Sequence, residues 1–126
     1  MGQGYLIDSN SIIDFFNNAL PESGVGLLID IEPRISVITQ IEVFSKRGLE
    51  SREIEKLHKF TNTATIYDVN SAVAEQAINI RLKYNVKLPD AIIAATAICH
   101  NLILVTRNIA DFKNIADLEI INPHAI

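Results

Sequence analysis

The segment 102–106 restricts the possible fold more than any other part of the chain. Its sequence, Leu-Ile-Leu-Val-Thr, is continuous, apolar and rich in β-branched side chains, which is typical of a central parallel strand covered on both faces. Parallel strands need crossover connections, usually helices, because a tight turn can join only antiparallel neighbours. This segment therefore predicts a chain in which strands alternate with helices.

The rest of the sequence agrees with that expectation. Shorter strand-like runs occur at residues 5–7, 34–38, 64–67 and 118–121. Apolar residues recur at helical spacing in the segments near residues 10–16, 25–31, 39–44, 51–60, 73–82 and 88–101. We therefore predict an α/β fold, a three-layer α/β/α sandwich around a central parallel sheet, formed by residues 1–126 as a single domain.

Composition excludes several classes of protein. Although 48% of the residues are hydrophobic, no apolar run reaches the roughly 18 residues of a membrane span. The N-terminal residues lack the pattern of an export signal, so we expect a cytoplasmic protein with no membrane partner. Cys99 is the only cysteine, which excludes an internal disulfide and a cysteine-based metal site. Its apolar helical surroundings predict a position in the core.

The net charge of -4 argues against a broad basic surface for nucleic acid. A nuclease remains compatible with this charge, because acids that gather around metal ions change the potential that a substrate meets. The position of the acidic residues therefore matters more than their sum.

Four acidic residues occupy similar places in the predicted elements. Asp8 ends the first strand, Glu42 lies one turn into the helix after the second, Asp90 opens a helix, and Asp111 follows the strand at 102–106. The carboxyl ends of parallel strands meet at one edge of a sheet, where ligands bind. Because Mg²⁺ and Mn²⁺ prefer oxygen ligands, such a cluster predicts a metal site suited to phosphodiester cleavage.

Helix capping is the competing explanation for each of these acids. Thr39 and Glu42 have the spacing of a capping box, and Asp90 would bring negative charge into the first turn of a helix. Asp8 and Asp111 also stand where a residue would cap a helix. Caps occur at both edges of a sheet, however, whereas all four acids fall at the ligand-binding edge in the predicted order of elements.

Four sequence blocks resemble a known family. They are residues 6–10 (LIDSN), 38–42 (ITQIE), 89–97 (PDAIIAATA) and 104–112 (LVTRNIADF). In order and separation these blocks resemble PIN domains, especially VapC-type toxins, and the resemblance runs from about residue 5 to residue 122. It implies a Mg²⁺- or Mn²⁺-dependent endoribonuclease that cleaves RNA, that is commonly a homodimer, and that a small antitoxin protein holds inactive.

The resemblance assigns metal binding and catalysis to Asp8, Glu42, Asp90 and Asp111, with support from Asn10, Thr106 and Asn108. The fourth acidic position stays open, because the amide Asn108 precedes the acid Asp111 and either would serve as the closer ligand. Thr106 matches a supporting hydroxyl of the family, and Asn10 would orient Asp8 or the substrate.

Other charged and apolar residues lead to further expectations. Candidates for contacting RNA phosphates are the basic residues Arg34, Lys46, Arg47 and Arg107, with a solvated surface position as the competing interpretation. Asp14 is attributed to a charged helical surface. The helices at residues 12–16 and 25–31 predict a homodimer, because they carry more hydrophobic surface than a small monomer easily covers.

Two alternative functions stay open at this point. Receiver-like phospho-acceptor modules also gather acids at a sheet edge, but they need a lysine after the last strand, and residues 122–124 offer none. A PIN-like protein that binds without turnover is the second alternative. Metal-dependent cleavage of RNA would separate the proposed enzyme from both.

Overall fold

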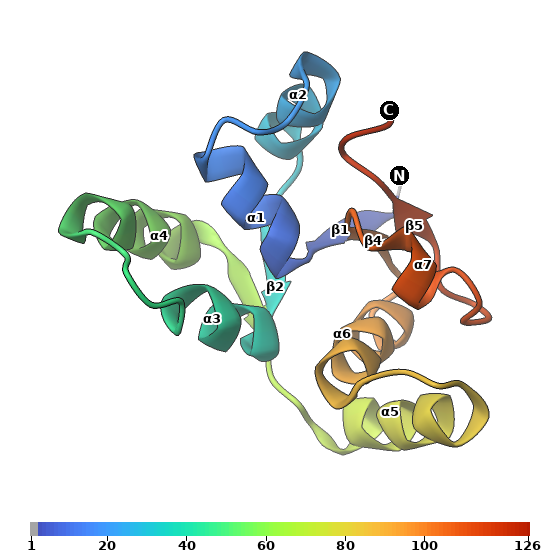
Figure 1. Ribbon diagram of the computed structural model, residues 1–126. Helices are drawn as coiled ribbons and strands as arrows, with labels where there is room; N and C mark the ends of the chain where they lie inside the picture. The colour runs from blue at the N-terminus through green and yellow to red at the C-terminus, as the bar shows by residue number, and fades with distance from the viewer. Residues whose placement is uncertain (1–2) are drawn as a thin grey trace.

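The computed structural model describes residues 3–126, in which strands alternate with helices (Figure 1). The strands are β1 (Gly4–Ile7), β2 (Arg34–Ser36), β3 (Thr65–Tyr67), β4 (Leu102–Val105) and β5 (Ile120–Ile121). The helices are α1 (Ser9–Phe16), α2 (Glu22–Asp30), α3 (Val37–Phe44), α4 (Ser51–Thr63), α5 (Ser71–Lys83), α6 (Leu88–Cys99) and α7 (Ile109–Phe112).

The strands pair in parallel, as predicted. β4 lies between β1 and β5, and its register with β1 places Ile7 opposite Val105. β2 and β3 form a second parallel pair, and β2 packs beside β1 (Figure 1). The expected central strand is therefore β4, and the strands β1 and β4 end side by side at one edge of the sheet.

Two hydrophobic cores lie on opposite faces of the strands. Leu6 of β1 packs in one core with residues of α5 and α6, including Val73 and Ala94. Its neighbour Ile7 packs in the other core, which contains Ile12 of α1 and β2 and α3 residues. Successive side chains of a strand point to opposite faces, so this division confirms the three-layer α/β/α sandwich.

Cys99 does not lie in the core, so that prediction was wrong. Its side chain is exposed at the last residue of α6, where the Sγ donates weakly to the Ala72 carbonyl over 3.7 Å. The buried surface of α6 consists instead of the residues from Ala91 to Ala97 that face the sheet and α5. No helix among residues 3–126 is long and apolar enough to cross a membrane.

The reason given for dimerisation also changes. Part of the helices at residues 12–16 and 25–31 is covered within the monomer, because Ile12 is buried and Phe16 and Leu28 pack on the second core. Large apolar side chains that stay exposed include Leu82 and Ile78 of α5, with exposed fractions of 82% and 58%, and Ile29 of α2, with an exposed fraction of 66%. The homodimer itself stays a prediction.

Candidate active site

Asp8 lies where the ends of β1 and β4 meet. It directly follows β1 and is the N-cap of α1, where its Oδ1 accepts from the Ser9 backbone N–H over 2.8 Å. Its Oδ2 accepts from the Thr106 hydroxyl over 2.9 Å and from the Asn10 amide over 3.1 Å. Asp8 is therefore a helix cap, as the competing explanation held, and its second oxygen is held by the two residues that the sequence assigned to support it.

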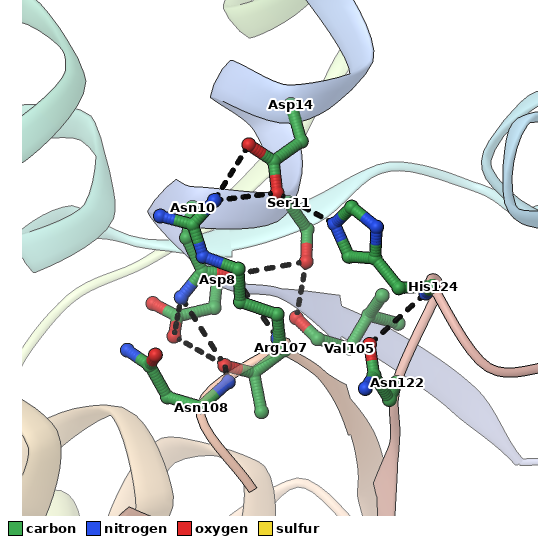
Figure 2. A network of polar contacts seen from close by, with 10 residues as sticks. Asp8, Asn10, Ser11, Asp14, Val105, Arg107, Asn108, Asn122 and His124 are labelled. Carbon is green, nitrogen blue, oxygen red and sulfur yellow. Dashed lines mark hydrogen bonds and ion pairs between the residues drawn. The ribbon is translucent and has the colours of Figure 1, made fainter. Parts of the chain in front are cut away.

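Thr106 and Asn10 connect Asp8 to the loop after β4. The Thr106 hydroxyl also accepts from the Asn108 backbone N–H over 3.1 Å, and the Asn10 side-chain oxygen accepts from the Arg107 backbone N–H over 3.2 Å (Figure 2). Burial raises the pKa of Asp8, while the hydrogen bonds from Thr106, Ser9 and Asn10 oppose that rise. The carboxylate is thus buried and oriented at once.

Glu42 reaches the same edge from α3. The N-cap of α3 is Ser36, whose Oγ accepts from the Ile38 backbone N–H over 3.1 Å, so the capping box of Thr39 and Glu42, which was the competing explanation for Glu42, does not form. Glu42 lies in the second turn, where it is exposed and its Oε1 accepts from the Ser9 hydroxyl over 3.2 Å. Capping therefore does not explain Glu42.

The pKa of Glu42 links it to the other acids. Shielding of the carboxyl group from water, although the residue as a whole is exposed, raises this pKa most, and the charges of Asp8 and Asp90 raise it further. The hydrogen bond from Ser9 acts in the opposite direction. Glu42 therefore interacts electrostatically with two other predicted site residues, Asp8 and Asp90.

Asp90 occupies the first turn of α6 and is half-buried. Its pKa is raised by burial, then by the charges of Asp8 and Asp111, while the charge of Lys87 opposes the rise. Asp111 is exposed in the first turn of α7. Asp90 and Asp111 also line one polar cavity of about 270 Å³. The structure thus brings all four predicted acids to one edge.

The donor chemistry of this cluster fits Mg²⁺ or Mn²⁺, since every predicted ligand offers oxygen and the charges of neighbouring acids raise the pKa of Glu42 and of Asp90. The side chains are not arranged as a complete set of metal ligands. Within residues 3–126, no three acidic, histidine or cysteine side chains are arranged to hold one ion. The residue types are therefore suitable, and binding would require the carboxylates to turn toward a shared ion.

One buried acid escaped the sequence analysis. Asp14 of α1 is only 6% exposed, so its assignment to a charged helical surface was wrong. Its two carboxylate oxygens accept from Arg107 Nη1 over 2.8 and 2.9 Å, and its Oδ2 lies 2.8 Å from His124 Nε2 (Figure 2). The signal available was helical spacing, because Asp14 falls on the same face of α1 as Asn10 and Ser11.

The contact between Asp14 and Arg107 also bears on the basic residues that were predicted to contact RNA. Arg107 and Arg34 were candidates for RNA phosphates, but Arg107 is paired with Asp14, and Arg34 lies 2.9 Å from Glu32. Lys46 and Arg47 are exposed in the turn after α3. The cations that line the cavity of Asp90 and Asp111 are instead Arg81 and Lys87, which the sequence analysis did not single out.

A comparison with known protein families gives a match that is consistent with this parallel sheet and the acids at its carboxyl edge. The family model of the PIN domain matches residues 5–118. The chain therefore belongs to the PIN domain family, whose members are generally nucleases. This membership leaves the receiver-like alternative without support.

Solved structures narrow the resemblance to VapC-type PIN domains. A toxin–antitoxin complex from Klebsiella pneumoniae contains a chain with 31% identity and a TM-score of 0.79, and the match covers 98% of this chain and 100% of that one. A chain of VapBC2 from Rickettsia felis, bound to a promoter DNA fragment, shares 27% identity with a TM-score of 0.79, covering 94% and 97%.

A more distant structure has the same fold. DNA-bound VapBC from Salmonella typhimurium contains a chain with 22% identity and a TM-score of 0.81, covering 97% of this chain and 99% of that one. A search of curated proteins gives no match. The similarity to VapC-type PIN domains is therefore confirmed by structure.

Proposed function

We propose that this chain is a Mg²⁺- or Mn²⁺-dependent endoribonuclease and the toxin of a toxin–antitoxin pair. The observation that carries the proposal is the gathering of acids from separate segments at one sheet edge, where the hydroxyl of Ser9, next to Asp8, donates to Glu42 and where Asp90 and Asp111 line one cavity. Asp8 raises the pKa of both Glu42 and Asp90, and Asp111 raises that of Asp90. Mutual repulsion costs stability, and a bound divalent cation turns the same arrangement into ligation.

Asp8, Glu42, Asp90 and Asp111 are the residues that would hold the metal. When bound, the ion would activate water and offset the charge of the phosphodiester. Thr106 and Asn10 fix the orientation of Asp8, and Ser9 donates to Glu42. Asn108 stands in the same loop, beside Thr106, where it would contact either the ion or a water molecule on it.

The proposed partners are an RNA substrate, a cognate antitoxin protein and a second copy of the chain. The toxin–antitoxin complex from Klebsiella pneumoniae supports the antitoxin, because it contains a chain of the same fold with 31% identity. Exposed Ile78 and Leu82 support self-association, since side chains of this kind are usually covered.

The decisive experiment is cleavage of RNA by the purified chain. We expect cleavage of single-stranded or loop RNA with Mg²⁺ or Mn²⁺, and none in excess chelator. Asp8→Asn should abolish cleavage, whereas the matched variant Asp68→Asn, in the exposed loop before α5, should retain it. RNA binding without any cleavage by the unaltered chain would favour a catalytically inactive PIN domain instead.

The toxin role needs a separate measurement. We expect expression of the chain in a bacterial host to arrest growth, and expression of Asp8→Asn to leave growth unchanged. RNA cleavage without growth arrest would support an RNA-processing enzyme rather than a toxin.

A further inference from the structure

A polar cavity adjoins the acid cluster. It has a volume of about 270 Å³ and is lined by Arg81 at the end of α5, by Asn85, Val86 and Lys87 of the connecting loop, and by Asp90 and Asp111. Binding sites for drug-sized ligands usually measure about 300–1,000 Å³. This smaller, polar space is suited to one nucleotide unit of a longer strand.

The two cations of this cavity are available to a ligand. Arg81 and Lys87 are both exposed, and neither forms an ion pair within residues 3–126. In contrast, Arg107 and Arg34 are paired with acids of the chain itself. The part of the chain that the structure describes thus holds unpaired positive charge directly beside the predicted metal ligands.

The combination of charges matches one ligand chemistry. The sugar–phosphate backbone of a nucleic acid presents one anionic phosphate per nucleotide, and Arg and Lys are its usual contacts. A strand cut at Asp90 and Asp111 must continue on both sides of the cut. The cavity is lined both by these two residues and by two cations, so it offers a place for the next nucleotide.

We propose that this cavity binds the nucleotide next to the scissile phosphodiester, with Arg81 and Lys87 contacting its phosphate and Asn85 hydrogen-bonding its ribose or base. This inference rests on the proposed ribonuclease function. Arg81, Lys87 and Asn85 would then determine how strongly RNA is bound, and the acids would determine whether it is cleaved.

The test compares RNA binding by matched variants. Fluorescence anisotropy with a labelled pool of short single-stranded RNAs of randomised sequence is measured in the Asp8→Asn background, with Mg²⁺ present. Arg81→Gln and Lys87→Gln should each weaken binding about three- to tenfold and lower the salt slope by about 0.7. The controls Arg52→Gln and Lys56→Gln, exposed on α4, should leave both quantities unchanged.

The outcomes separate this inference from the proposed function. If the unaltered chain cleaves RNA but Arg81→Gln and Lys87→Gln bind it as tightly as the controls do, the cavity assignment is overturned and the enzyme assignment stands. If the variants lose binding as expected and the unaltered chain cleaves nothing, the cavity stands as an RNA-binding site and the ribonuclease assignment is overturned. Absence of RNA binding in the Asp8→Asn background, or loss of the thermal transition in either cavity variant but in neither control, overturns the inference.

Discussion

Arg107 Nη1 lies 2.8 and 2.9 Å from the two carboxylate oxygens of Asp14, so one ion pair joins α1 to the loop that follows β4. His124 Nε2 approaches the same carboxylate from the C-terminal segment. Three segments that are distant in sequence thus meet at one buried acid. The loop held in this way is the loop that carries Thr106 and Asn108.

Replacement of Asp14 should therefore loosen the protein. We expect Asp14→Ala to lower the free energy of unfolding by about 1–2 kcal/mol, a value reduced by the half-exposed side chain of Arg107. Urea denaturation measures this change. Asp68→Ala, at an exposed loop position, serves as the control and should change stability by less than about 0.5 kcal/mol. Equal effects of the two substitutions would contradict a structural role for the contact.

Asp90→Asn should separate activity from stability. The substitution removes a charge that repels its neighbours, so RNA cleavage should be lost while the metal-free protein becomes more stable, by less than about 1 kcal/mol after solvent screening. Cleavage with Mn²⁺ and thermal melting with and without metal test both effects on one sample. An active but destabilised variant would mean that Asp90 is only a helix-terminal residue.

The raised pKa values predict how stability depends on pH without metal. Asp8, Glu42 and Asp90 bind protons more tightly in the folded state than in the unfolded one. Their contribution to the free energy of unfolding is thus fully present below the pKa values of the unfolded state, 3.8 and 4.5. It is lost as the pH rises through the higher pKa values of the folded state. Urea denaturation in chelator should show this loss, with a smaller loss in Asp90→Asn. Identical pH profiles of stability for the unaltered chain and Asp90→Asn would argue against charge repulsion between Asp90 and its neighbouring acids.

Thr106→Val should reduce activity through Asp8. The substitution keeps the shape of the side chain but removes the hydroxyl that donates to Asp8 Oδ2 and accepts from Asn108 N–H. We expect cleavage or metal affinity to fall about 10- to 100-fold, as for other residues that orient a metal ligand. Thr106→Ser retains the hydroxyl and should recover most of the loss. Full activity in Thr106→Val would contradict this role.

Leu82→Glu should prevent self-association. Leu82 is 82% exposed on α5, and Ile78 lies one turn away, so a charge at this position would be buried in any dimer formed there. Sedimentation should show a dimer for the unaltered chain and a monomer for Leu82→Glu. Ile29→Glu, at an exposed position on α2, is the control and should remain dimeric. The reverse result would return the interface to the helices first predicted from sequence.

The elements were predictable where local pattern and burial agree. The run at 102–106 is β4 because a strand covered on both faces must be apolar throughout. The start of α6 followed from Pro89, which is favoured in a first helical turn. The acids could be assigned to one edge because parallel strands fix where their carboxyl ends lie.

The remaining features depend on contacts that the local sequence does not encode. Ser36 and Thr39 both have capping chemistry, and the length of β2 decided which residue caps α3. The local sequence of Asp14 is that of a surface acid, and its contacts come from Arg107 and His124, which are far along the chain. Arg81 and Lys87 likewise became notable only when the fold placed them on the cavity of the acids.

The exposed position of Cys99 makes the chain suitable for site-specific spectroscopy. A spin label on this single cysteine would sit about 14 Å along α6 from Asp90, nine residues away, and so beyond direct contact with substrate. In a dimer formed through α5 and α6, two such labels would report the separation of the copies by pulsed electron resonance. Because neighbouring groups partly shield the exposed Cys99 thiol from water and so raise its pKa, little thiolate is present at neutral pH, and labelling will proceed faster in mildly alkaline buffer.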